Sequence, residues 1–317
     1  MRASLVTASL RYVEQVARSG SIQRAAKEMN IAASAIDRQL LLLEQDLGVE
    51  LFERLPRGMR PTAAGDAIVA MARRWRADER RAVADLRQLQ GVDQGHVRLV
   101  AMDSHVNGFL PNLIARLSAD HPGISLDVDV ASPDAALGAL LNEEADIAAV
   151  FNLSPRREIH VLWTAELPIG CLVAPGHPLS RAASVSFQEA VSHRLALQSR
   201  ALTIRRYLDA HYGWLLGDAR RTVVTNSLQL VKRLAVEGGH VAFTSEVDAA
   251  PELLSGALVF LPVRDRAVEA QTVSVAINAR RPLSRVSRLV ADKLVAEVSG
   301  CLDAVRRKRE PAKGIAP

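Results

Sequence analysis

The chain has 317 residues, 49% of them hydrophobic and 24% charged, and a net charge of +5, which suits about two or three packed domains. No run approaches the roughly 18 apolar residues of a membrane span, and Arg2, Arg11 and Glu14 interrupt any signal-peptide core. Cys171 and Cys301 stand far apart without metal-ligand spacing, so neither a disulfide framework nor a zinc site is indicated. We therefore expect a cytoplasmic protein without a membrane segment.

The charge is unevenly distributed along the chain. Residues 1–90 carry 15 basic and 11 acidic side chains, residues 91–305 carry 20 and 23, and residues 306–317 carry 5 and 1. A basic N-terminal part suits a polyanionic partner, and the more acidic middle part suits a different task. Residues 306–317 are expected to form a solvated, disordered basic tail.

Residues 1–61 are predicted to form short helices joined by tight turns. Apolar residues recur at helical spacing on either side of Ser19-Gly20-Ser21, and a third helix follows Asn30. One side of that third helix carries an apolar stripe, which consists of Ile36, Leu40, Leu43 and Leu47. Its other side carries small polar residues, as in a helix-turn-helix that enters the DNA major groove. The spacing fits an ordinary helical hairpin equally well.

The segment after the third helix favours DNA binding. Arg54, Arg57 and Arg60 surround Pro56 and Gly58, whose turn preferences predict a tight basic loop or a two-stranded wing. A basic loop next to a groove-binding helix can contact the phosphates or the minor groove.

Residues 62–90 are predicted to form one long linker helix with Thr62 as its N-cap. At 1.5 Å per residue its length is about 40 Å, and it carries one apolar stripe. A second copy of the chain can cover this stripe, which would pair two DNA-binding modules at the spacing of palindromic half-sites. Alternatively, the stripe packs on the C-terminal part of the same chain.

Residues 91–305 alternate strands with helices, which predicts an α/β fold with a mostly parallel sheet. A segment of this length suits two lobes, with lobe I at 91–165 and 268–305 and lobe II at 166–267. Strands are expected at 97–102, 124–130, 146–151, 169–174, 194–198, 221–225, 240–244, 257–261 and 272–277.

The sequence resembles the LysR-type transcriptional regulators over almost its whole length. GSIQRAAKEMNIAASAIDRQLLLLEQDLGVELFERLPRGMRPTAAG follows the family's helix-turn-helix, wing and linker start nearly position for position, and NSLQLVKRLAVEGGHVAF resembles its effector domain. The resemblance implies an N-terminal all-α winged helix-turn-helix with a long linker helix. It also implies a C-terminal α/β effector domain with the two-lobed periplasmic-binding-protein fold, and a homodimer that usually assembles into a tetramer.

By position, the resemblance implies DNA contacts from Ala32, Ala33, Ser34, Asp37, Arg38, Leu41, Arg54, Arg57 and Arg60. The sequence departs from the family where Ser, Gln and Pro are usual at residues 32–34, Ser at Asp37, and basic residues at Leu41 and Leu42. Fewer donors and one carboxylate weaken the attraction to phosphate. Asp37 can accept a hydrogen bond from cytosine N4, or it can serve the first helical turn as a cap. We expect Arg38 to make the main polar contact.

In the family the effector lies between the lobes, near strand ends and helix starts whose free N–H groups favour anions. The corresponding residues are Asp103, Ser104, His105, Ser132, Gln198, Ser199, Arg200, Asn226 and Thr244. Ser104, Ser199 and Arg200 together suit a carboxylate or a similar anion, whereas Asp103 suits an amine equally well. Each residue alone is also typical of a helix cap.

The sequence gives no indication of catalysis, a cofactor or a metal. The 8 histidines form no metal or triad signature, and no glycine-rich phosphate loop, CxxC pair or GxSxG motif occurs. The main hypothesis is a sequence-specific DNA-binding transcription regulator controlled by a small-molecule effector. The alternative is a cytoplasmic ligand-binding or metabolic protein whose N-terminal helices serve oligomerisation only.

Overall fold

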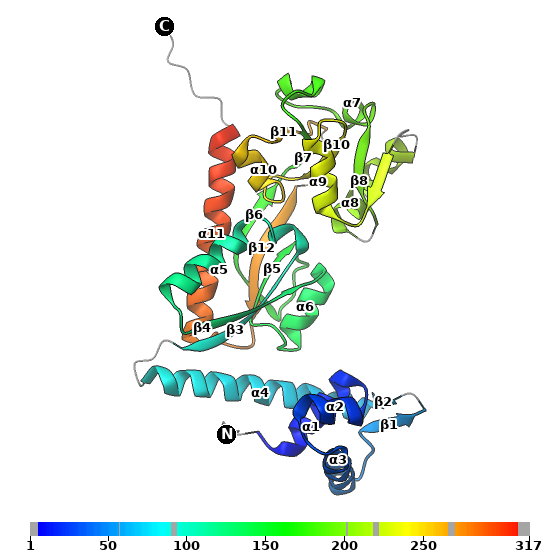
Figure 1. Ribbon diagram of the computed structural model, residues 1–317, viewed down its shortest axis with the longest axis vertical. Coiled ribbons are helices and arrows are strands. Elements are labelled where there is room, and N and C mark those ends of the chain that lie inside the picture. Colours follow the sequence, from blue (N-terminus) through cyan, green and yellow to red (C-terminus); the bar gives the residue numbers. More distant parts are fainter. Residues whose placement is uncertain are drawn as a thin grey trace. The chain divides into compact units, whose positions relative to one another are not determined.

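The computed structural model describes residues 6–56, 58–89, 94–200, 202–217, 222–265 and 270–309. The chain divides into two compact units, the first ending at Gln94 and the second comprising most of the rest (Figure 1).

The N-terminal unit is a winged helix-turn-helix followed by a long helix. Its elements are α1 (Ala8–Ser19), α2 (Ile22–Met29), α3 (Ala33–Leu47), the antiparallel hairpin of β1 (Phe52–Leu55) and β2 (Gly58–Pro61), and α4 (Ala63–Leu89). The predicted third helix and two-stranded wing are therefore confirmed. The core between the helices contains Val13, Val16, Ala25, Ala26, Ile36, Leu40, Leu51, Phe52 and Val69.

Local signals in the sequence set the ends of these helices. Gly20 and Asn30 adopt left-handed φ angles of 63° and 55°, which end α1 and α2. The Ser21 hydroxyl accepts a hydrogen bond from the Arg24 N–H at the start of α2, and the Thr62 hydroxyl accepts one from the Gly65 N–H at 3.0 Å at the start of α4.

The C-terminal unit contains two five-stranded sheets, one in each lobe. In lobe I the strand order is β4-β3-β5-β12-β6, and in lobe II it is β11-β7-β10-β8-β9. The lobe I strands are β3 (Gly95–Ala101), β4 (Ile124–Val130), β5 (Ile147–Phe151), β6 (Ile159–Leu167) and β12 (Gln271–Asn278). The lobe II strands are β7 (Ile169–Val173), β8 (Leu195–Gln198), β9 (Thr222–Thr225), β10 (Val241–Ser245) and β11 (Val259–Pro262).

Both sheets are mixed, but four of the five strands in each point the same way, so the prediction of mostly parallel sheets is confirmed for strand direction, with β12 and β7 as the exceptions. β3 is parallel to β4 and β5, and β8 is parallel to β9 and β10, but β12 and β7 are antiparallel to their neighbours. The reason is that the chain crosses between the lobes twice. β6 leads directly into β7, and the chain returns from β11 to β12, so β7 and β12 run against the other strands of their sheets.

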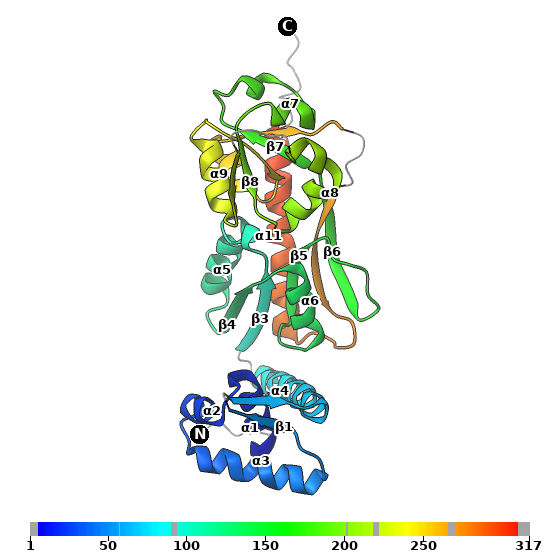
Figure 2. The ribbon, with the colours of Figure 1, turned by 90° about the vertical axis from the view of Figure 1, so that its right-hand side faces the viewer.

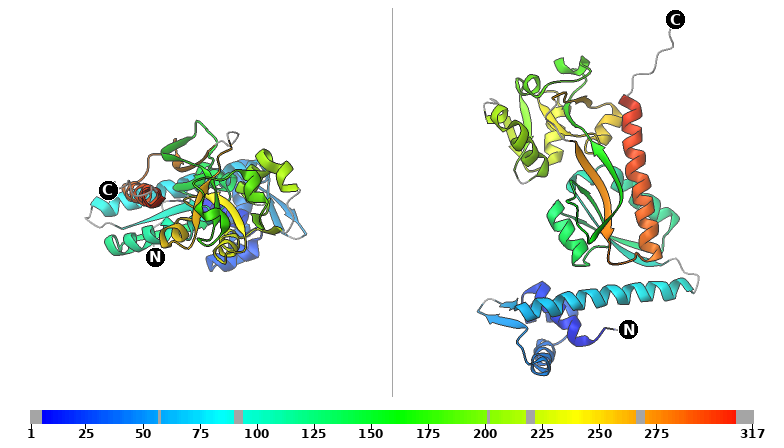
Figure 3. Two further views of the ribbon diagram at one scale, coloured as in Figure 1. Left: turned by 90° about the horizontal axis from the view of Figure 1, so that it is seen from above. Right: turned by 180° about the vertical axis from the view of Figure 1, so that it is seen from behind.

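Helices cover both sheets. They are α5 (Phe109–Asp120), α6 (Pro133–Leu141), α7 (Phe187–Val191), α8 (Thr203–Gly217), α9 (Leu228–Val236), α10 (Ala250–Ser255) and α11 (Arg285–Arg309), with short 3-10 turns η1 (Asp103–His105) and η2 (Pro178–Arg181). α11 runs beside both lobes (Figures 2 and 3). Its Val290 and Leu294 pack in the lobe I core, and its Val305 packs with Phe260 of lobe II.

The last helix corrects the expected boundary of the basic tail. Residues 306–309 are the last turn of α11 rather than part of a disordered segment. Arg306 Nε donates to the buried Glu246 carboxylate at 2.7 Å, and Arg309 binds the same carboxylate. This ion pair holds the end of the helix on lobe II. Residues 310–317 lie outside the described part of the chain.

Candidate DNA-binding and effector sites

The exposed side of α3 carries most of the residues expected to contact DNA. Ser34 and Arg38 are exposed one helical turn apart, and Ile36 and Leu40 on the other side are buried. Ala32 is the N-cap residue and makes no side-chain cap, so the first N–H groups of α3 receive no side-chain partner from it. Leu41 is exposed on the same helix.

The wing lies against the helix-turn-helix and is tied to it by a backbone hydrogen bond. The Met59 N–H donates to the Gly20 carbonyl oxygen at 2.9 Å. Gly58 has a φ of 142°, and a Cβ atom there would lie 2.4 Å from the same oxygen, so only glycine fits this close approach.

The two described wing arginines both form ion pairs. Arg54 Nη2 lies 2.7 Å from Asp37 Oδ1 of α3, and Arg60 Nη2 lies 2.5 Å from Glu53 Oε2 of β1. Arg57 lies outside the described residues. Asp37 is beyond the first turn of α3, which has no acidic residue, so the capping role considered for it is wrong.

Two cations on α2 were not singled out from the sequence. Arg24 and Lys27 are exposed, on either side of the buried Ala25 and Ala26. The first helix of a helix-turn-helix crosses the DNA backbone, where lysine and arginine bind phosphate. In the sequence, the two basic residues on the polar side of this short helix were the signal for a phosphate contact.

The residues expected at the effector site fall into two groups. Ser104, His105, Gln198 and Thr244 are buried at or just after the carboxyl ends of β3, β8 and β10. Asp103, Ser132 and Asn226 are exposed, and the Ser132 hydroxyl accepts a hydrogen bond from the Ala135 N–H at the start of α6. Ser199 uses its N–H to bind the Thr225 carbonyl oxygen at 2.7 Å.

A buried carboxyl group that the sequence analysis missed joins two of these residues. The Thr244 hydroxyl donates to Asp248 Oδ2 at 2.5 Å, and the Ser104 hydroxyl is near enough to lower the pKa of Asp248. Burial outweighs these contacts and raises that pKa above its ordinary value. Asp248 follows β10, so its position after a strand was the signal in the sequence.

Several buried polar atoms at or just after the carboxyl ends of β3, β8 and β10 make no hydrogen bond within the described residues. They are Ser104 Oγ, Asp248 Oδ1 and Gln198 Oε1, while Gln198 Nε2 donates to the Phe243 carbonyl oxygen at 2.8 Å. Such atoms are usually satisfied by water or by a ligand. Gln198 Oε1 can only accept hydrogen bonds, and Asp248 Oδ1 can only accept them when its carboxyl group is ionised.

His105 is a neutral, fully buried ring. It lies 4.9 Å from the Phe109 ring and 5.0 Å from the Phe151 ring, measured between centroids. Burial lowers the pKa of His105 to about 3, although the backbone of Ala149 opposes this shift. The residue therefore belongs to the lobe I core and carries no charge at neutral pH.

Arg200 does not join Ser104 in an anion site. Its side chain is 80% exposed, and its Nε lies 2.7 Å from Asp209 Oδ2 of α8. Asp209 also pairs with Arg205. Lys232, the buried cation nearby, donates to the Asp248 carbonyl oxygen at 3.0 Å and pairs with Glu252. The anion site expected from Ser104, Ser199 and Arg200 is therefore not assembled in this structure.

Across the described residues, no cluster of three or more His, Cys, Asp or Glu side chains is arranged to hold a metal ion. No helix there has both the length and the apolar character needed to cross a bilayer.

Comparison with known families decides the class of protein. Residues 7–66 match "Bacterial regulatory helix-turn-helix protein, lysR family", and residues 90–299 match "LysR substrate binding domain". The chain belongs to the LysR family. It is a LysR-type DNA-binding transcription regulator with an effector-binding domain, and not an enzyme. The alternative of a metabolic protein that uses its N-terminal helices only for oligomerisation is set aside.

Relatives of this LysR-type regulator are regulators too. The chain is 27% identical to the RuBisCO operon transcriptional regulator of Allochromatium vinosum, across 72% of this chain and 74% of the relative. It is 25% identical to a probable RuBisCO transcriptional regulator of Synechocystis, across 95% and 88%.

Solved structures share the fold of this LysR-type chain. Full-length OxyR from Pseudomonas aeruginosa matches with a TM-score of 0.61 and 20% identity, over 92% of this chain and 95% of that one. Full-length CbnR in complex with its target DNA matches with a TM-score of 0.57 and 20% identity, over 95% and 98%. The combination of winged helix-turn-helix and two-lobed α/β domain is therefore the LysR arrangement.

Proposed function

We propose that α3 enters the major groove of duplex DNA with Ser34 and Arg38 toward the base edges. The observation that carries this proposal is the division of α3 into a buried apolar side and an exposed side with small and cationic residues. The wing then lies along the adjacent backbone, and Arg24 and Lys27 of α2 contact phosphates. A protein with this task acts in the cytoplasm, where the chromosome of a bacterial cell is.

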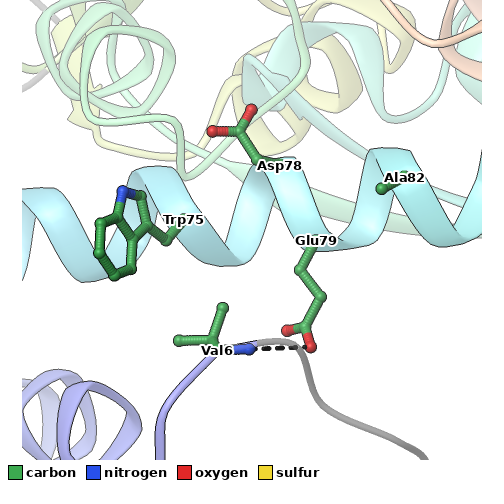
Figure 4. Close-up of a pocket in the computed structure, with 5 residues that line it drawn as sticks. All are labelled: Val6, Trp75, Asp78, Glu79 and Ala82. Atoms are coloured by element: carbon green, nitrogen blue, oxygen red, sulfur yellow. Dashed lines mark hydrogen bonds between the residues drawn. The ribbon is translucent and has the colours of Figure 1, made fainter.

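Two copies of α4 pair and thereby join two DNA-binding modules. One side of α4 packs within its own unit, where Val69 and Ala72 are buried against the helical core. Trp75 and Leu86 are exposed, and a shallow cavity of about 260 Å³ is lined by Val6, Trp75, Asp78, Glu79 and Ala82 (Figure 4). The apolar part of this lining suits an apolar side chain of a second copy. OxyR and CbnR share this fold, and the family's usual tetramer follows from pairing of the effector domains.

The effector binds between the lobes, near the carboxyl ends of β3, β8 and β10. Ser104, Gln198 and Thr244 are buried there, and the Asp248 carboxyl group lies beside them. A ligand with hydrogen-bond donors satisfies the unpaired oxygen atoms of Gln198 and Asp248. Regulation follows if this ligand binds one arrangement of the lobes more tightly than another, because equal affinity would change nothing.

Electrophoretic mobility shift of the full chain tests DNA binding directly. The probe is a duplex selected by the protein from a random pool, with a scrambled duplex as control. We expect nanomolar to sub-micromolar affinity that falls steeply with salt, because each neutralised phosphate releases about 0.9 counterion. Affinity that is equal for both duplexes at every salt concentration would contradict sequence-specific binding.

A thermal-shift screen of the full chain tests the effector site separately. A metabolite that binds only the folded protein raises its melting temperature. The variant Gln198→Leu removes one of the unpaired oxygens and is expected to weaken the response, while Gln188→Leu makes the same change at an exposed position of α7 and is the matched control. Equal responses of both variants would place the ligand elsewhere.

A further inference from the structure

Two neighbouring leucines are exposed on the side of α3 proposed to face DNA. Leu41 and Leu42 are 43% and 42% exposed, whereas Leu40 beside them is buried. They follow Arg38 by three and four positions, so both are its neighbours on the helix surface. Together with Ser34 and Arg38 they form a strip two helical turns long, which we call the groove strip.

The groove strip has little capacity for polar contacts. Arg54 of the wing is bound to Asp37 of α3, and Arg60 of the wing is bound to Glu53. Within α3 and the described residues of the wing, Arg38 is the one cation without an ion pair. The Asp37 carboxylate pairs through Oδ1 with Arg54, so a base would have to share it with a guanidinium.

An apolar side chain in the major groove has one natural target. Among the four bases only thymine presents an apolar group there, the C5-methyl group. Groove-binding helices use residues up to two turns apart for base contacts, which is the length of the groove strip. Burying a leucine against a methyl group removes apolar surface from water on both sides.

We propose that Leu41 and Leu42 contact thymine methyl groups and make thymine a requirement at the bases they face. The inference rests on the proposed insertion of α3 into the major groove. The competing occupant for these leucines is another protein surface. DNA is the occupant that the structure favours, because the two leucines are continuous with Ser34 and Arg38 on one exposed side of the helix.

The experiment replaces thymine by deoxyuridine, which removes the methyl group and keeps every hydrogen-bonding atom. The probe is the duplex selected by the full chain from a random pool, with its thymines replaced one at a time. Each methyl group contacted by leucine is expected to contribute about fourfold to affinity, the effect of one buried carbon. The variants Leu41→Ala and Leu42→Ala should each lose sensitivity to deoxyuridine at their own position.

Leu47→Ala is the matched control. Leu47 is 45% exposed on the same helix but lies two and a half turns after Arg38, about on the opposite side. This variant should keep the wild-type response to deoxyuridine. Circular dichroism of all three variants checks that the exposed substitutions leave the fold intact.

Three outcomes would overturn the inference. Wild-type binding that is unchanged by deoxyuridine at every thymine overturns it while leaving DNA binding intact. A shift in oligomeric state of Leu41→Ala or Leu42→Ala in sedimentation, with unchanged DNA binding, assigns the leucines to a contact between copies. Failure to enrich any duplex from the pool overturns this inference and the proposed function together.

Discussion

Arg54 of the wing and Asp37 of the DNA-facing helix form an ion pair, with 2.7 Å between Nη2 and Oδ1. The pair joins β1 to α3 and takes one positive charge out of the surface that would otherwise attract phosphate. It also competes with the hypothesis that Asp37 accepts a hydrogen bond from cytosine, because a base would have to share the carboxylate with the Arg54 guanidinium. We therefore expect Asp37 to lower the affinity of the wing for DNA.

Removing the charge of Asp37 should therefore strengthen DNA binding. Asp37→Asn frees Arg54 for one phosphate, so the slope of log affinity against log salt should steepen by up to about 0.9. Asp46→Asn makes the same charge change at an exposed position of the same helix and is the control. If both variants show the same slope, Arg54 either leaves Asp37 in the complex or does not touch DNA.

Arg38 is the cation of α3 that the structure leaves exposed and without an ion pair among the described residues, so its loss should act in the opposite direction. Arg38→Ala should weaken binding and reduce the salt slope by about 0.9 if the guanidinium meets a phosphate. A contact with a guanine edge would instead relax sequence preference at one position. Titration against the selected and scrambled duplexes separates these two outcomes. Arg18→Ala, which removes an arginine paired with Glu28, is the control. Unchanged affinity, slope and preference in Arg38→Ala would contradict both roles.

The backbone of the N-terminal unit was predictable because its signals are local. Ser21, Asn30 and Thr62 act within a few residues of where they stand, and the stripe of Ile36 and Leu40 follows from helical periodicity alone. The Asp37–Arg54 pair was not predictable, since it joins residues 17 positions apart through side-chain orientations. Leu47 continues the stripe in the sequence but is exposed, because α3 extends beyond the packed core.

In the C-terminal unit the buried strands were predictable and the irregular ones were not. β5 and β10 are apolar runs that are buried throughout, which is a strong strand signal. β6 was missed because it is an edge strand with mixed side chains, and its pairing with β12 shifts register between Val275 and Ala276. Glu246 was missed as well, because its partners are 60 and 63 positions away on α11.

Glu246 gives a third prediction, on stability. Its side chain is 1% exposed and holds both Arg306 and Arg309, so Glu246→Gln leaves two guanidinium groups without their carboxylate. Both arginines are partly exposed, so we expect a loss of about 2 kcal/mol in the free energy of unfolding rather than the full cost of a broken buried pair. Urea unfolding of the full chain measures it. Glu237→Gln, which breaks the exposed pair with Arg233, should change the free energy by less than about 0.5 kcal/mol.

The same variant tests how the lobes are held together. Arg306 also donates to the Glu166 carbonyl oxygen at 2.8 Å, on the strand that leads from lobe I to lobe II. Loss of Glu246 should therefore increase hydrogen exchange in the last turn of α11 and at the end of β6. An unfolding free energy equal to that of wild type, with unchanged exchange in both segments, would show that the ion pair does not hold α11 on lobe II.

His105 gives the last prediction, on pH. The folded protein holds the ring neutral down to a pKa of about 3, whereas in the unfolded chain the ordinary value is 6.5. Between these values the unfolded state binds one more proton, so the stabilisation is complete above about pH 6.5 and is lost as the pH falls. The slope from this residue is about 1.4 kcal/mol per pH unit. Most carboxyl groups titrate below the window from about pH 5 to 6.5. Burial also lowers the pKa of His177 and raises that of Asp248, so the part of the slope due to His105 is the difference between the wild type and a variant without this imidazole.

Two substitutions at His105 separate titration from packing. His105→Phe keeps an aromatic ring against Phe109 and Phe151, and His105→Asn does not, yet both remove this titrating group and should reduce the slope between pH 5 and 6.5. Phe109→Leu loses packing, keeps the imidazole, and should retain the wild-type slope at lower overall stability. If His105→Phe still loses stability in acid as steeply as the wild type, then the buried His105 imidazole does not cause the loss of stability in acid.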